Sequence, residues 1–162
     1  ILDDSSFPQE EVIDLPIVRF PDPKCRYTVR LGNGTGAPVE GQIRVGEPLF
    51  HSWECSYGRK ENSLYCLMVN KCTVADKERM NEKIEIIDEF GCSLYPSILP
   101  HVSYEGDLSA GLGVNAFSLD VDQTAVFFEC NIKMLLKLNG VCRRPTCQPL
   151  EVFQRGQRRW RR

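Results

Sequence analysis

The sequence has little that would support a metal site or a membrane span. Its 162 residues include only two histidines, His51 and His101, and the eight cysteines form no Cys-x-x-Cys pair. Zinc sites are usually built from such closely spaced pairs, so we expect no metal site and no cofactor. No apolar run reaches the roughly 18 residues of a membrane-spanning helix, so we expect no membrane contact within this chain.

The charge is close to balanced, with 20 basic and 22 acidic residues and a net charge of −2. Residues 155–162 hold five of the arginines and no acid, which leaves a body with 15 basic and 22 acidic residues. An acidic body does not suit a phosphate backbone, so no nucleic-acid partner is expected.

The cysteines are even in number and span nearly the whole chain, which indicates a disulfide framework formed in an oxidising compartment. A secreted, extracellular protein is therefore expected. They are Cys25, Cys55, Cys66, Cys72, Cys92, Cys130, Cys142 and Cys147. Bridged cysteines leave no free thiol for nucleophilic catalysis, so we do not expect an enzyme and assign no catalytic residue.

The remaining polar candidates are weak. His51 shares a predicted strand face with Leu49 and Trp53, which favours a hydrogen-bonded core histidine over a catalytic one. His101 lies in a proline-bounded loop with no evident partner. Asp120 and Asp122 could bind calcium, although a solvated carboxylate pair is the commoner interpretation.

Alternating apolar and polar residues predict strands at 25–31, 49–55, 84–88 and 126–138, with weaker ones at 43–45 and 114–119. Residues 64–72 are apolar on both faces and predict a central strand. Residues 73–83 are charged and are expected at the surface, and a helical turn is compatible with residues 97–102. About seven short strands separated by turns indicate an all-β, immunoglobulin-like β-sandwich.

Composition divides the chain into three parts. Residues 1–24 are rich in proline and acids and are expected to be an interdomain linker, residues 25–150 form the sandwich, and residues 151–162 form a basic tail. The chain begins at Ile1 without a leader, which indicates a mature or excised fragment. The linker contains an apolar island that either docks on the domain or takes part in assembly; its apolar residues are Val12, Ile13, Leu15, Ile17, Val18 and Phe20.

Asn33, Gly34 and Thr35 form an N-glycosylation sequon in a glycine-rich turn. The triplet suits a secreted glycoprotein, although such triplets also arise by chance.

Six motifs in order resemble those of zona-pellucida-type (ZP) domain proteins, in particular the nematode cuticlin-like ones. They are VGEP (residues 45–48), HSWEC (51–55), YCLMVNKCTV (65–74), IDEFGC (87–92), FFECNI (127–132) and CRRPTC (142–147). The resemblance covers about residues 23–149 and identifies the chain as the C-terminal, immunoglobulin-like half of a ZP module (ZP-C), with the interdomain linker attached.

The resemblance implies a structural role in an apical extracellular matrix such as cuticle, through assembly or incorporation. The expected partners are other ZP-domain or matrix proteins, or further copies of this chain, and the precursor could be membrane-anchored. The alternative is the ectodomain of a ZP-type receptor or co-receptor that binds a protein ligand.

The resemblance also implies that Cys72 pairs with Cys130 and Cys92 with Cys147. A further family cysteine, expected near Leu135, is missing, so Cys142 needs another partner. Cys55 and Cys66 lie eleven residues apart across a polar loop, a distance that suits a hairpin disulfide. By elimination, Cys25 would then bridge to Cys142.

The basic tail ends in Arg159, Trp160, Arg161 and Arg162, which fit the pattern cut by furin-like proprotein convertases. In ZP precursors such a site lies just after the C-terminal half and precedes a hydrophobic segment. The convertase is therefore an expected processing enzyme, and we take the chain to end as cleavage would leave it. A solvated tail that binds polyanions is the alternative.

Overall fold

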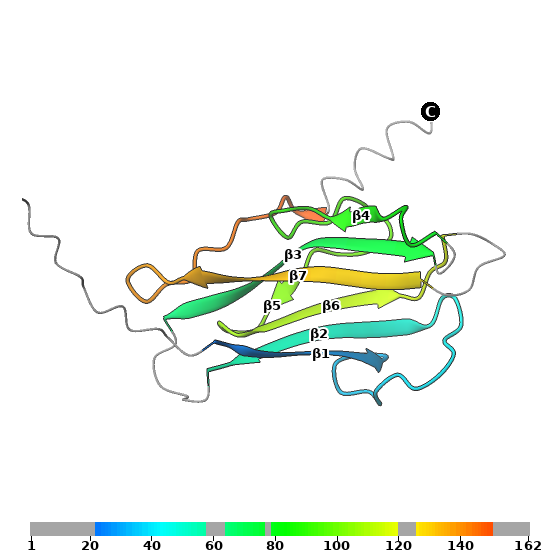
Figure 1. Ribbon diagram of the computed structural model, residues 1–162, viewed down its shortest axis with the longest axis horizontal. Coiled ribbons are helices and arrows are strands. Elements are labelled where there is room, and N and C mark those ends of the chain that lie inside the picture. The colour runs from blue at the N-terminus through cyan, green and yellow to red at the C-terminus, as the bar shows by residue number, and fades with distance from the viewer. Residues whose placement is uncertain (1–21, 58–63, 77–78, 120–125, 151–162) are drawn as a thin grey trace, which may run out of the picture.

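The computed structural model describes residues 22–57, 64–76, 79–119 and 126–150, and within them the chain forms an immunoglobulin-like β-sandwich. One antiparallel sheet has the order β1-β2-β6-β5 and the other the order β4-β3-β7. The long strands run nearly along the long axis of the molecule (Figure 1). The strands are β1 (Lys24–Leu31), β2 (Pro48–Ser56), β3 (Tyr65–Asp76), β4 (Ile84–Ile87), β5 (Ser103–Tyr104), β6 (Ser109–Asn115) and β7 (Val126–Leu136).

Strand β2 shows how the sequence pattern produces the core. Leu49, His51, Trp53 and Cys55 alternate with more exposed residues and are all buried, as the period-two pattern predicts. They face the other sheet, where β3 supplies buried apolar side chains to the same core. The predicted central position of β3 is confirmed, since it lies between β4 and β7.

A β-bulge in β3 changes which residues face the core. Asn70 pairs with Asn131 and Thr73 with Glu129, so two residues of β3 lie opposite one residue of β7. The first of the two, Lys71, has a positive φ of 48° and is exposed. The core face therefore passes from odd-numbered to even-numbered residues of β3, which brings Cys72 and the residues after it inward.

Much of the edge of β3 that faces β4 has no strand partner, because β4 has four residues and β3 has twelve. Side chains and turns take its place. The Val69 amide donates to the Tyr104 hydroxyl (3.1 Å), and that hydroxyl donates to the Val69 carbonyl oxygen (3.3 Å). The Leu67 amide donates to the Asp107 carbonyl oxygen at 2.7 Å. The backbone groups of this edge are thus satisfied without a further strand.

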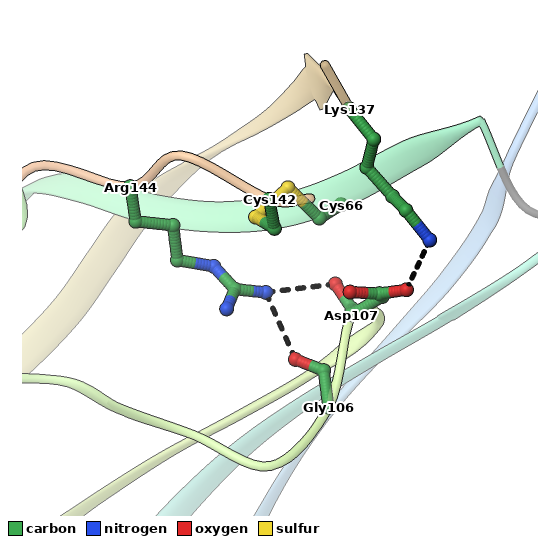
Figure 2. Close-up of polar contacts among 6 residues, drawn as sticks. All are labelled: Cys66, Gly106, Asp107, Lys137, Cys142 and Arg144. Atoms are coloured by element: carbon green, nitrogen blue, oxygen red, sulfur yellow. Dashed lines mark hydrogen bonds and ion pairs between the residues drawn. A yellow bond between two sulfur atoms is a disulfide. The ribbon is translucent and has the colours of Figure 1, made fainter. Parts of the chain in front are cut away.

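Arg144, in the segment after β7, completes this cover (Figure 2). Its Nε donates to the Leu67 carbonyl oxygen (2.7 Å), and its Nη2 donates to the carbonyl oxygens of Gly106 (3.0 Å) and Asp107 (2.9 Å). The guanidinium carbon lies 4.0 Å from the centre of the Tyr104 ring, in cation–π geometry. One side chain therefore joins β3 to the turn between β5 and β6.

Further bonds hold the segment after β7 against β3 and against the turn between β5 and β6. Lys137 Nζ lies 2.7 Å from Asp107 Oδ2, and Cys142 is bonded to Cys66 on β3, as Figure 2 shows. His101 joins the same segment, because its Nδ1 accepts from the Ser93 amide (2.9 Å) and its Nε2 bonds the Gln148 carbonyl oxygen (2.6 Å). Of the two partners that the sequence left unidentified for His101, Ser93 is eight residues away and Gln148 is 47 residues away.

The sandwich contains four disulfides and the described residues hold no free cysteine. The bonds are Cys25–Cys55, Cys66–Cys142, Cys72–Cys130 and Cys92–Cys147. The last two are the pairs that the resemblance implied.

The predicted Cys55–Cys66 and Cys25–Cys142 bonds are wrong. The loop between Cys55 and Cys66 joins β2 of one sheet to β3 of the other, so the two strands do not form a hairpin. Cys55 lies on the inner face of β2, whereas Cys66 lies on the outer face of β3. Cys25 is the direct cross-strand neighbour of Cys55, with a Cα–Cα distance of 4.1 Å. Cys142 is therefore free to bond Cys66 in the segment that covers β3.

Three local predictions also need correction. Residues 43–45 form no strand, because Gly41 and Gly46 adopt left-handed φ values of 90° and 91° on either side. The strand expected at 114–119 lies instead at Ser109–Asn115. Residues 73–76 continue β3 and are largely buried rather than exposed. The helical turn considered near residues 97–102 is a single turn, in which the Ile98 and Leu99 amides donate to the Tyr95 carbonyl oxygen (2.9 and 3.1 Å).

We expect Arg144→Ala to lower the free energy of unfolding by on the order of 2 kcal/mol, because partly buried carbonyl oxygens lose their donor. Arg144→Lys should recover only part of this loss, since an ammonium cannot reproduce the forked geometry. Chemical denaturation with the disulfides intact would measure both. Arg143→Ala, at the exposed neighbouring arginine, is the control; an equal loss in that variant would contradict the role given to Arg144.

Candidate functional site

A cleft of about 750 Å³ opens between the two sheets on the side where β1 and β7 form their edges. Its walls come from β1, β2, β6, the start of β7 and the loop that precedes β2. The apolar side chains that line it are Val29, Val39, Ile43, Val45, Leu49, Val114, Ala116, Phe117, Val126, Phe127 and Phe128. The cleft therefore suits an apolar occupant.

Aromatic rings form the inner wall of this cleft. The His51 ring lies 4.4 Å from Phe128, and Tyr27 stacks on Trp53 at 5.3 Å, measured between ring centres. A hydrogen bond of 2.7 Å joins the Tyr27 hydroxyl to His51 Nδ1. His51 is thus the hydrogen-bonded core histidine that its strand position favoured. Trp53 and Phe128 each share a strand face with a cysteine, which predicts that both are buried. Trp53 is buried, but the prediction is wrong for Phe128, which is only partly buried because it borders the cleft.

Burial determines the protonation state of the two polar groups in this wall, the His51 imidazole and the Tyr27 hydroxyl. It lowers the pKa of His51 from 6.5 to about 4, since the apolar surroundings penalise the imidazolium. It raises the pKa of the Tyr27 hydroxyl to about 12 for the same reason. Both groups are therefore neutral at physiological pH, so this aromatic inner wall carries no charge that would repel an apolar segment.

Acid should destabilise the fold through His51. Between about pH 6.5 and about pH 4 the unfolded chain binds a proton at His51 that the folded chain does not, so stability falls as the pH falls. The expected loss over this window is about 3 kcal/mol. Denaturation curves at several pH values should show this slope in the wild-type protein and a shallower one in His51→Gln. Equal slopes would contradict the assignment.

Exposed apolar side chains flank the mouth of the cleft. Val45 is 62% exposed and Phe127 is 48% exposed, although both line the cleft. The residues predicted as a strand at 43–45 thus belong to its wall. Large apolar side chains left in water on both sides of a cleft indicate a surface that another apolar segment covers.

The second edge of β7 borders the same cleft. Strand β7 has eleven residues, and β3 is its only strand neighbour in the part of the chain that the structure describes. Its hydrogen bonds to β3 use one edge, which leaves the other edge without a backbone partner among the described residues. The edge of β1 differs, because residues 37–39 bond Val29 and Leu31 there (each 2.9 Å).

The other predicted sites are distributed as follows. Asn33 lies in an exposed turn after β1, away from the cleft lining. The apolar island at residues 12–20, the tail with Arg159, Arg161 and Arg162, and the pair Asp120 and Asp122 lie outside the described residues. Within the described ranges no cluster of His, Cys, Asp and Glu could hold a metal ion, and no helix has the length and apolarity to cross a membrane.

The sequence did not reveal the cleft. Ile43, Val45 and Phe127 are apolar, and a period-two pattern cannot distinguish a core position from one that borders a cleft. The available signal was the placement of Ile43 and Val45 between two glycines, which favours a loop over a strand.

Comparison with known proteins agrees with this architecture. The chain matches the family described as Cuticlin C-terminal domain over residues 21–151. It is 32% identical over 146 residues to Cuticlin-3 of Caenorhabditis elegans, which covers 90% of this chain and 34% of that protein. Cuticlin-1 of the same organism is 30% identical over 134 residues, covering 82% and 30% of the two chains.

Cuticlin-4 is 34% identical over 115 residues, covering 71% of this chain and 22% of the relative. The chain thus spans about a third or less of the length of these curated relatives. With its family match, its two antiparallel sheets and its four disulfides, the chain belongs to the cuticlin C-terminal domain family, a family of structural cuticle components rather than of enzymes.

Proposed function

We propose that this chain is the ZP-C half of a secreted protein of an apical extracellular matrix, and that it acts in matrix assembly by accepting a β-strand at β7 and the adjoining cleft. Its relatives are named as cuticlins, and its disulfides require an oxidising compartment. In this mode of recognition backbone hydrogen bonds supply affinity, and pockets for alternate side chains supply specificity.

The observation that carries the proposal is that the β4-β3-β7 sheet has its backbone groups satisfied on the β4 side but not on the β7 side. On the β4 side, Tyr104 and Arg144 satisfy the backbone of β3 where no strand does. On the opposite side, β7 presents an edge with no backbone partner among the described residues, beside an apolar cleft. Proteins generally protect long exposed edges, because unpaired N–H and C=O groups attract other strands. An edge left open next to apolar side chains therefore suits a strand from elsewhere.

The apolar island is the proposed donor. Residues 12–20 would extend over roughly 30 Å as a strand, a length comparable to that of β7. The edge of β1 is partly occupied by residues 37–39, so β7 offers the longer free edge. Pro16 cannot donate to a ladder, which restricts it to a position whose nitrogen faces away from β7. The donor belongs to a neighbouring copy or to a related matrix protein.

The receptor alternative has less support. A receptor ectodomain would recognise a distinct protein ligand, and the relatives that match this chain carry the names of cuticlins. The cleft is lined mainly by aliphatic and aromatic side chains, which suits a repeating structural contact between matrix chains.

A glycan placed on β7 should block assembly. Lys133→Thr creates an N-glycosylation sequon that begins at Asn131, on the outward side of this strand, where Asn131 is exposed. In the full-length protein, tagged with a fluorescent protein, we expect normal secretion and loss of most matrix incorporation, because the sugar prevents a second strand from approaching.

The double variant Asn131→Gln with Lys133→Thr is the matched control, since it changes the same strand without a sequon. It should enter the matrix as the wild type does. Full incorporation of a Lys133→Thr protein shown by mass to carry the added glycan would refute the use of this edge.

Cleavage in the basic tail is the proposed trigger of matrix assembly. We propose that a proprotein convertase cuts after Arg159-Trp160-Arg161-Arg162 and so releases a downstream segment that occupies the β7 edge in the precursor. Changing Arg159, Arg161 and Arg162 to Ala should give an uncleaved protein that reaches the cell surface but stays out of the matrix. Immunoblotting would measure cleavage and imaging would measure incorporation. Normal assembly by the uncleaved form would exclude release as the trigger.

A further inference from the structure

The turn that follows β1 is tight and exposed. Residues 32–35 are all exposed, and the Gly36 amide donates to the Asn33 carbonyl oxygen at 3.0 Å. A Cβ on Gly36 would lie 1.7 Å from the Leu31 carbonyl oxygen, so only glycine fits there. The turn therefore presents Asn33 at a fixed place on the surface.

Within this turn the Asn33 side chain uses only its oxygen. Asn33 Oδ1 accepts from the Thr35 amide (3.1 Å) and from the Thr35 hydroxyl (2.6 Å). Its Nδ2, which would carry a sugar, has no hydrogen-bond partner among the residues that the structure describes. A sugar on Nδ2 would thus break no hydrogen bond of the folded turn.

We propose that Asn33 carries an N-linked glycan, and that this glycan keeps the outer face of the β1-β2-β6 sheet in contact with solvent in the assembled matrix. Attachment forms a bond between Asn33 Nδ2 and C1 of the first sugar. It breaks the bond from that carbon to the pyrophosphate of a polyprenyl carrier, the donor class, and releases an amide proton. The family places the chain in an extracellular matrix, and a chain bound for that matrix passes through the secretory pathway, where this modification is added.

The position of the turn determines which face the glycan covers. A Cβ on Gly34 would lie 3.2 Å from the Phe50 ring, so the turn packs against Phe50. Phe50 lies between the inward-facing Leu49 and His51 and therefore points outward, where its ring covers Gly111. The turn and its sugar thus lie on the outer face of this sheet, on the side away from the cleft.

The rest of this outer face is polar. Thr28 Oγ1 and Ser52 Oγ share a hydrogen bond of 2.6 Å across β1 and β2, and Arg30 Nη1 donates to the Gly36 carbonyl oxygen at 3.0 Å. A face built from hydroxyl and guanidinium groups gains little from burial against another protein. The position of the glycan and the polarity of the face therefore both indicate that this side of the sheet contacts solvent.

Peptide mapping of the full-length protein, secreted from eukaryotic cells, tests the site. The peptide that contains Asn33 should carry a hexosamine-initiated glycan, and peptide N-glycosidase should convert Asn33 to Asp. Asn33→Asp keeps an acceptor oxygen for Thr35 but should lose the glycan mass, whereas Thr35→Ser keeps the sequon and should retain it. Unmodified Asn33 in the wild-type protein would overturn the assignment.

Peptide N-glycosidase also tests whether the outer face of the β1-β2-β6 sheet contacts solvent in the matrix. Applied to intact matrix without denaturant, it should release the Asn33 glycan, because the sugar faces solvent. Resistance in intact matrix, with release after denaturation, would place this face in an interface and overturn that part of the proposal. Retention of all four disulfides in Asn33→Asp would show that the variant folds. These results do not depend on whether β7 accepts a strand.

Discussion

The need to satisfy the backbone of β3 organises the rest of this domain. The strand has twelve residues and lies at the centre of its sheet, yet β4 pairs with only three of them. Buried N–H and C=O groups without partners would cost as much as lost hydrogen bonds. Tyr104, Arg144 and the turn at Asp107 supply the missing partners. Each comes from a segment distant in sequence, so their positions have to be fixed by other means.

Two disulfides fix the position of Arg144. Cys66–Cys142 and Cys92–Cys147 join residues 76 and 55 positions apart, and both attach the segment that carries Arg144. A link across a loop of this length stabilises a fold by on the order of 4 kcal/mol, largely by restricting the unfolded chain. The cover over one edge of the sheet is therefore permanent. It also keeps residues 137–147 away from the opposite edge of β7, which is the edge that borders the cleft.

Much of the fold could be predicted from the sequence, because local alternation sets which residues face inward. The pattern identified β1, β2, β7 and the central position of β3. It missed β6, whose sequence Ser-Ala-Gly-Leu-Gly-Val-Asn has poor intrinsic strand propensity. That strand forms because Phe50 covers its glycines: a Cβ on Gly111 would lie 2.4 Å from the ring. The dependence of one strand on an aromatic residue of another is a tertiary effect that periodicity cannot reveal.

The candidate site was harder to predict than the fold. The pairing of Cys25 with Cys55 requires that β1 and β2 be neighbours, and the cleft requires that β1 and β7 lie at the edges of facing sheets. Both are properties of strand order, which the sequence pattern does not contain. The bulge at Lys71 adds a further difficulty, because it moves the core face of β3 by one residue in the middle of the strand.

The geometry also bears on the kind of assembly that such a domain can form. In the proposed contact the donor is the apolar island before β1 and the acceptor is the edge of β7, so the two surfaces differ. A contact between unlike surfaces is heterologous, and it closes into a ring only when the rotation between subunits happens to close. Otherwise each added subunit presents a fresh acceptor and growth continues. A self-complementary edge would instead stop at a dimer, because two copies of β7 would occupy each other. An open acceptor on one side and a glycosylated, polar face on the other would therefore give extended structures, as a matrix requires.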